Sequence, residues 1–225
     1  MRPAVFGGGN QDIFHLSFER TNDYNTEQTR EAEVMTTMLR EIVWTTKEML
    51  DLPEGGKDRW LIRGRMWETE MTKRNRFHSR TMVRVAYLFE RWAETQPEPR
   101  GEVTCGEAGF IIRKNPDSTV GIDVAYVSPE VMSIPFGSTT LYDGIPTVAV
   151  EILSPNNTDE EIVEKVRDYL DVGVPHVWVI QPILKTVTIY RPGYGGVMCS
   201  GDQIVTAEPH LPGFSAPAKA FFAIV

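Results

Sequence analysis

The sequence predicts a mixed α/β fold. Residues 147–180 form a strand, helix and strand pattern, with the helix from about Thr158 to Val172. A helix of about a dozen residues between two apolar strands, with short connections, is typical of a parallel crossover unit. A second observation is a predicted antiparallel hairpin, Glu102–Lys114 and Gly121–Val127, around an Asn-Pro-Asp-Ser turn. A third is a long helix pattern over Asn75–Glu94. Strands of both directions are therefore expected beside helices.

The first 44 residues are predicted to form an extension to the folded domain. Residues 1–25 contain glycines and lack a hydrophobic pattern, so we expect a loose or partner-dependent segment. Thr26–Trp44 is predicted as a helix, because acidic residues come early and apolar residues recur at helical spacing. This extension is a candidate docking arm for a partner.

Residues 45–225 are predicted to form one domain, whose remaining elements follow from hydrophobic spacing and turn residues. The long helix is expected to bury a stripe made of Val83, Tyr87, Leu88 and Trp92. Residues 128–144 show little periodicity and are predicted as a connection. The other predicted elements are a short helix starting at Thr45, two strands over Arg59–Met71 with a turn at Gly64, strands over Lys185–Tyr190 and Ile204–Ala207, a turn over Gly193–Gly196 and an apolar tail over Ala218–Val225.

The composition is that of a folded protein, with 41% hydrophobic residues and a net charge of −8. No apolar run approaches the roughly 20 residues that span a bilayer, and residues 1–10 lack the apolar core of an export signal. We therefore expect a cytoplasmic protein without a membrane partner. The two cysteines form no zinc motif. The negative charge argues against general affinity for a nucleic-acid backbone but leaves room for a local basic groove.

Two carboxylates interrupt apolar strands. Asp123 lies in the run Ile-Asp-Val-Ala, and Glu151 lies in the run Val-Ala-Val-Glu-Ile-Leu. A charge inside a buried strand is costly unless it is paired or holds a metal. Because carboxylate oxygens suit Mg²⁺ or Mn²⁺, we predict that Asp123 and Glu151 hold such an ion together. The alternative for each residue is a purely structural acid.

The crossover helix brings a lysine to the same region. At 100° per residue, Lys165 falls at the margin of the apolar face, beside Tyr169, whereas Asp168 falls on the opposite, polar face. Lys165 is therefore predicted to lean toward Glu151 and to position or activate a water that attacks a phosphodiester. Tyr169 would donate a supporting hydrogen bond. The alternatives are a lysine that extends along the helix flank and a tyrosine that only packs in the core.

The only basic cluster lies on the first half of the long helix. Arg74, Arg76 and Arg80 are predicted to line a nucleic-acid groove, with an ordinary solvated face as the alternative. His78, in the same turn, is predicted to lie at the edge of the site and to contact phosphate, with a structural histidine as the alternative.

Several motifs resemble the bacterial Uma-two family of restriction-endonuclease-like proteins. The matching segments are Thr104–Phe110, Asn115–Asp117, Gly121–Val127, Val150–Pro155, Glu164–Leu170, Gly173–Pro175, Val177–Val179, Val187–Arg191 and Leu211–Phe214. The resemblance covers roughly residues 45–222 and is most specific from Glu-x-x-Ser-Pro to Lys-x-x-x-Tyr. It implies the PD-(D/E)xK nuclease fold, which is a central mixed sheet flanked by helices with a metal-dependent phosphodiesterase site.

The resemblance also implies roles for individual residues. Asp123 and Glu151 fill the two acidic positions of the family pattern, and Lys165 fills a lysine position that has moved from strand to helix. Glu107 occupies a position where relatives often carry an acid. One segment departs from the pattern: where the family begins with Tyr-Glu-Leu-Ile-Asp-Gly-Glu, residues 59–65 of this chain are Arg-Trp-Leu-Ile-Arg-Gly-Arg.

Two functions remain open at this point. The first is a Mg²⁺- or Mn²⁺-dependent endonuclease that hydrolyses DNA, and the intact set of Asp123, Glu151 and Lys165 favours it. The second is a non-catalytic interaction module that keeps the nuclease fold and forms a homodimer. The acidic composition and the missing early acids favour this module.

Overall fold

The computed structural model describes residues 42–53, 55–70, 75–135, 137, 139–155 and 157–223. The chain divides into two units, Met1–Ile42 and Val43–Val225, and the described residues belong almost entirely to the second. The predicted extension over residues 1–44, with its helix, therefore lies outside the described residues except at its end. No helix in the described part of the chain is long and apolar enough to cross a membrane.

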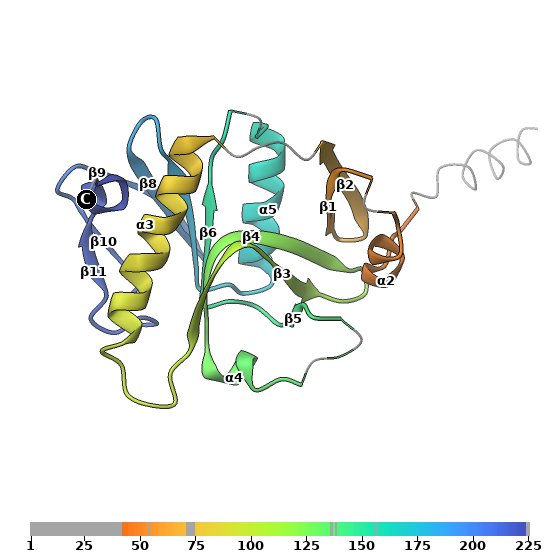
Figure 1. Cartoon of the computed structure of the whole chain (residues 1–225), viewed down its shortest axis with the longest axis horizontal. Helices are drawn as coiled ribbons and strands as arrows, with labels where there is room; N and C mark the ends of the chain where they lie inside the picture. Colours follow the sequence, from red (N-terminus) through yellow and green to blue (C-terminus); the bar gives the residue numbers. More distant parts are fainter. Residues whose placement is uncertain are drawn as a thin grey trace, which may run out of the picture. The chain divides into compact units, whose positions relative to one another are not determined.

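A large mixed sheet forms the centre of this second unit (Figure 1). Its main path runs β2-β1-β4-β6-β7-β8-β9, and β3 pairs with β4 and with β5. The pairs β6–β7 and β3–β5 are parallel and the other pairs are antiparallel, which confirms the predicted class. The strands are β1 (Lys57–Ile62), β2 (Arg65–Glu70), β3 (Glu102–Arg113), β4 (Ser118–Val127), β5 (Tyr142–Asp143), β6 (Val148–Ile152), β7 (His176–Gln181), β8 (Thr186–Arg191) and β9 (Tyr194–Ser200), with a separate pair β10 (Ile204–Thr206) and β11 (Ser215–Pro217).

The predicted crossover is present as β6, α5 (Asp159–Asp171) and β7. The hydroxyl of Thr158 accepts a hydrogen bond from the backbone N–H of Glu161, and the Glu161 carboxylate accepts one from the backbone N–H of Thr158. This reciprocal pair satisfies N–H groups that the first helical turn leaves free. The helix ends at Asp171, and Gly173 follows the capping residue Val172 with a φ of 92°, which favours glycine. Local sequence signals therefore fix both ends of α5.

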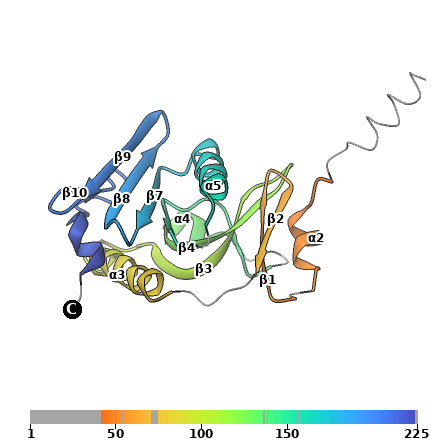
Figure 2. The same ribbon diagram turned by 90° about the horizontal axis from the view of Figure 1, so that it is seen from above.

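Two helices cover opposite faces of the sheet (Figure 2). Residues of α3 (Arg76–Ala93) pack with Val124, Val150 and Trp178 in one core cluster. Residues of α5 pack with Ala125 and Ala149 in the other cluster. Neighbouring residues of one strand enter different clusters because successive strand side chains point to opposite faces. The other helices among the described residues are α2 (Thr46–Leu50), α4 (Pro129–Met132) and the 3₁₀ helix η1 (Ala218–Phe222).

The structure corrects four expectations. The predicted apolar stripe of α3 is wrong in part, because Val83 and Tyr87 are 66% and 46% exposed whereas Val85 and Phe89 are fully buried. The expected connection over residues 128–144 contains α4 and β5. The glycine-rich turn at residues 193–196 opens strand β9, and the C-terminal tail begins with η1. The buried side of α3 is set by the distant segments that pack against it, which override the local pattern.

Candidate functional site

The two predicted acids, Asp123 and Glu151, lie side by side at the point where the pairing of strands β4 and β6 ends. The β4–β6 ladder runs from Tyr126 to Val124, and its register places Asp123 opposite Glu151 one position further on. Beyond that point the Asp123 carboxylate replaces a strand carbonyl, since its Oδ2 accepts the backbone N–H of Ile152 at 2.8 Å. Asp123 and Glu151 are each 5% exposed as whole residues. The strands therefore hold two acids at one buried place.

Helix α5 directs a lysine and a tyrosine at Glu151. The Lys165 ammonium donates to both Glu151 oxygens, with Nζ 3.2 Å from Oε1 and 3.1 Å from Oε2. The Tyr169 hydroxyl donates to Glu151 Oε1 at 2.6 Å. Lys165 Nζ also lies 3.2 Å from the carbonyl oxygen of Gly121. On this edge β4 pairs with β1 at Thr119 and with β6 only from Val124, so Gly121 lies in the gap between them.

The charge of Glu151 is under opposing influences. Burial raises the pKa of the Glu151 carboxyl above its ordinary value, and the nearby Asp123 carboxylate adds to the rise. The Lys165 ammonium and the Tyr169 hydroxyl oppose it by stabilising the ionised form. Burial, together with the same glutamate, raises the pKa of Tyr169 well above 10, so this phenol remains a donor. Glu151 is therefore a stronger proton acceptor than an ordinary surface glutamate.

The long helix α3 reaches the site through its first turn. His78 Nε2 lies 3.1 Å from Asp123 Oδ1, and the His78 side chain is 2% exposed. His78 Nδ1 has no hydrogen-bond partner among the described residues. A buried imidazole on a buried carboxylate orients that carboxylate. Arg76 and Arg80 lie on the exposed side of the same helix, and Arg74 lies outside the described residues.

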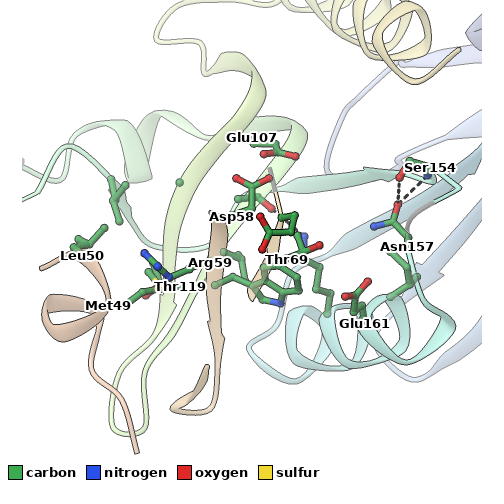
Figure 3. A pocket seen from close by; sticks show the side chains of 18 residues that line it. Met49, Leu50, Asp58, Arg59, Thr69, Glu107, Thr119, Ser154, Asn157 and Glu161 are labelled. Carbon is green, nitrogen blue, oxygen red and sulfur yellow. Dashed lines mark hydrogen bonds between the residues drawn. The ribbon is translucent and has the colours of Figure 1, made fainter. Parts of the chain in front are cut away.

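A cavity of about 230 Å³ lies beside the lysine (Figure 3). Lys165 and Glu107 both line it, together with Asn157, whose amide oxygen accepts from the Ser154 hydroxyl. Glu107 sits in a bulge of β3 at a φ of 62°, a conformation rare for residues with a side chain. A Cβ added to Gly121 would lie 3.3 Å from the Glu107 Cβ, so a glycine at 121 permits this close approach. The bulge thus brings Glu107 close to the β4 residue that accepts from Lys165.

Comparison with known proteins now decides the family. The family model Uma2, described as "Putative restriction endonuclease", matches residues 46–219. The chain belongs to the Uma2 family. A crystal structure described as "a putative nuclease belonging to DUF820 from Anabaena variabilis ATCC 29413" has a TM-score of 0.66 at 20% identity, over 79% of this chain and 97% of that chain. This likeness establishes a nuclease fold, and no curated protein matches the chain.

The side chains of this Uma2 site offer the type of ligand atom that a magnesium ion prefers. Asp123 and Glu151 offer carboxylate oxygens at one place, and Mg²⁺ commonly takes one or two protein carboxylates plus water and phosphate oxygens. Within the described ranges, no group of three or more His, Cys, Asp or Glu side chains could hold a metal. A cation on Glu151 would also compete with Lys165, which contacts both oxygens. The site therefore fits an ion that keeps most of its water or substrate ligands.

Two features of this Uma2 member escaped the sequence reasoning. The first is Trp60, which stands where the resemblance implies an acid and whose ring centroid lies 5.6 Å from Lys165 Nζ. Its other neighbour is Trp67, directly across the β1–β2 pair, with ring centroids 6.2 Å apart and planes 7° apart. An aromatic face attracts an ammonium. Trp60 therefore helps to hold Lys165, and the only signal in the sequence was the loss of the acid.

The second feature is a buried ion-pair network around Asp168. The prediction that Asp168 lies on the polar face of α5 is wrong, because this residue is fully buried. Its Oδ1 accepts from Arg63 Nε at 3.0 Å and from Arg113 Nη2 at 3.1 Å. Arg63 lies between β1 and β2 and also pairs with Asp171 on α5. The network ties the β1–β2 hairpin and the end of β3 to the helix that carries Lys165.

Proposed function

We propose that this domain is a metal-dependent endonuclease that hydrolyses DNA phosphodiester bonds. The observation that carries the proposal is that two buried carboxylates and one ammonium lie close together at the point where the pairing of β4 with β6 ends. Membership of the Uma2 family and the nuclease-like neighbour support a nuclease of this kind. Asp123, Glu151 and Lys165 are the proposed catalytic residues.

Each residue has a role that follows from its contacts. Asp123 and Glu151 would hold Mg²⁺ or Mn²⁺, which when bound offsets phosphate charge and activates water. Lys165 is near enough to donate to a phosphate oxygen beside Glu151 and so to stabilise charge that develops during cleavage. Tyr169 keeps Glu151 oriented, and His78 keeps Asp123 oriented. Glu107 is proposed to contact substrate or solvent within the cavity.

Nicking of supercoiled plasmid tests this function. We expect nicking with Mg²⁺ or Mn²⁺, none with EDTA, and a loss of at least about a hundredfold in Asp123→Asn. Asp202→Asn is the matched control, since the Asp202 side chain is 82% exposed and pairs only with Lys219 among the described residues. Activity should also fall on acidification, because ion binding requires ionised Glu151 and burial raises the pKa of this carboxyl.

A non-catalytic module is the second candidate, and one observation favours it. Both Glu151 oxygens already have protein donors, as in a structural ion pair. If plasmid remains intact at millimolar Mn²⁺ and Asp123→Asn differs from the natural protein only in stability, the module is the better description. Metal-dependent nicking that disappears in Asp123→Asn would exclude it.

A further inference from the structure

The exposed side of α3 carries an unusual concentration of arginine. At 100° per residue, Arg76, Arg80, Arg84 and Arg91 fall within a sector of about 80°, with Tyr87 inside it; we call these five residues the arginine face. The buried residues Val85 and Phe89 lie on the opposite side of the helix. The arginine face therefore points away from the core.

In the part of the chain that the structure describes, no ion pair neutralises the arginines of this face. Residues 75–89 contain three arginines and no Asp or Glu, in a chain with a net charge of −8, whereas Glu90 and Glu94 lie near Arg91 at the other end of the helix. An arginine that is not paired keeps its full charge for a ligand.

Aromatic rings contact three of the four guanidinium groups of the arginine face. The Cζ atoms of Arg84 and Arg91 lie 5.1 and 5.7 Å from the Tyr87 ring centroid. Arg76 Cζ lies 5.4 Å from the ring centroid of Phe77, which is 53% exposed. Arg84 is further fixed by donating to the carbonyl oxygen of Ala220. Such contacts orient the side chains without reducing their net charge.

The arginine face begins at the candidate site. His78, in the first turn of α3, contacts Asp123, and Arg76 and Arg80 lie two residues on either side of it. The start of α3 lies at the same edge of the sheet as the carboxyl end of β6, which carries Glu151 (Figure 1). A strand bound along the arginine face would therefore lead to this edge.

We infer that the arginine face binds the phosphate backbone of the nucleic acid that the site cleaves. This inference deepens the proposed function and rests on it for the substrate. From Arg76 to Arg91 the helix rises about 22 Å, which matches about six nucleotides of one strand at 3.4 Å each. Arginine is well suited to phosphate because its planar fork donates paired hydrogen bonds. The bases are not read here, so binding is expected to depend on salt and not on sequence.

Fluorescence anisotropy with a labelled 30-base-pair DNA duplex, in EDTA and over a range of NaCl, tests the inference without cleavage. The double variant Arg76→Ala/Arg80→Ala is expected to bind at least about tenfold more weakly, and the slope of log affinity against log salt should become shallower by about 1.8. The control is Arg167→Ala/Arg191→Ala, which removes the same charge from exposed arginines on α5 and β8. This control should bind like the natural protein.

Several results would overturn the inference. One is that the natural protein fails to bind the duplex at low salt. Others are that the double variant binds normally, or that the control loses as much affinity. Thermal unfolding of both variants should match the natural protein, because Arg76 and Arg80 are exposed. Binding in EDTA without any nicking in Mg²⁺ would contradict the proposed function but would still support phosphate binding by the arginine face. Nicking by the natural protein, together with normal binding by the double variant, would support the proposed function and overturn the inference.

Discussion

Lys165→Met is expected to reduce plasmid nicking at least about a hundredfold while the domain stays folded. The ammonium is the one cation shown to contact Glu151 in the described residues, and preorganised charges of this kind contribute about 10²–10³ to a rate. Methionine keeps the length and the apolar stem of lysine, so packing beside Trp60 and Ile162 should survive. Nicking rates at saturating Mg²⁺ measure the effect.

Lys47→Met is the control for this substitution. The Lys47 side chain is 82% exposed and pairs with Asp51 on the surface, so its loss should leave nicking unchanged. In the Lys165→Met variant, by contrast, Glu151 loses the ammonium of Lys165, so the pKa of Glu151 should be still higher. The activity that remains in this variant should therefore shift to higher pH. Normal nicking by a folded Lys165→Met variant would show that this lysine takes no part in the reaction.

Asp168→Ala is expected to lower the free energy of unfolding by about 2–3 kcal/mol. Removing one partner of a buried ion pair typically costs about 3–5 kcal/mol. The estimate is smaller here because Arg63 and Arg113, which would lose their acceptor, are 49% and 28% exposed and can reach water. Urea unfolding followed by circular dichroism measures the change.

Asp171→Ala provides a matched comparison for Asp168→Ala. Asp171 pairs with the same Arg63, but its side chain is 57% exposed, so its loss should cost less than about 1 kcal/mol. Equal effects of the two substitutions would mean that burial of Asp168 adds nothing to the pair. A larger loss in Asp168→Ala would support the view that this network anchors α5, and with it Lys165.

The parts of the fold that follow local rules could be predicted from the sequence. The crossover over residues 147–180 has apolar strands, a capped helix and a terminal glycine, and each signal acts within a few residues. Asp123 and Glu151 stood out because charges are rare in apolar strands. The side of α5 on which Lys165 lies followed from helical periodicity. These three inferences needed no knowledge of distant contacts.

The features that depend on distant contacts could not be predicted in this way. Asp168 is buried because Arg63, 105 residues earlier, neutralises it, and periodicity alone assigned it to solvent. Trp60 reaches Lys165 only through the pairing of β1 with β4. The phase of the buried stripe on α3 is set by the sheet and by η1, which decide that Val85 is covered and Val83 is not. Such choices are made by tertiary packing.

The most direct test of the central claim is a crystal grown with Mn²⁺ and measured at a wavelength where manganese scatters anomalously. The account predicts one anomalous peak about 2.2 Å from an oxygen of Asp123 and an oxygen of Glu151, with Lys165 Nζ moved off at least one Glu151 oxygen. An anomalous map without a peak at these carboxylates, from crystals with manganese at millimolar concentration, would contradict the account.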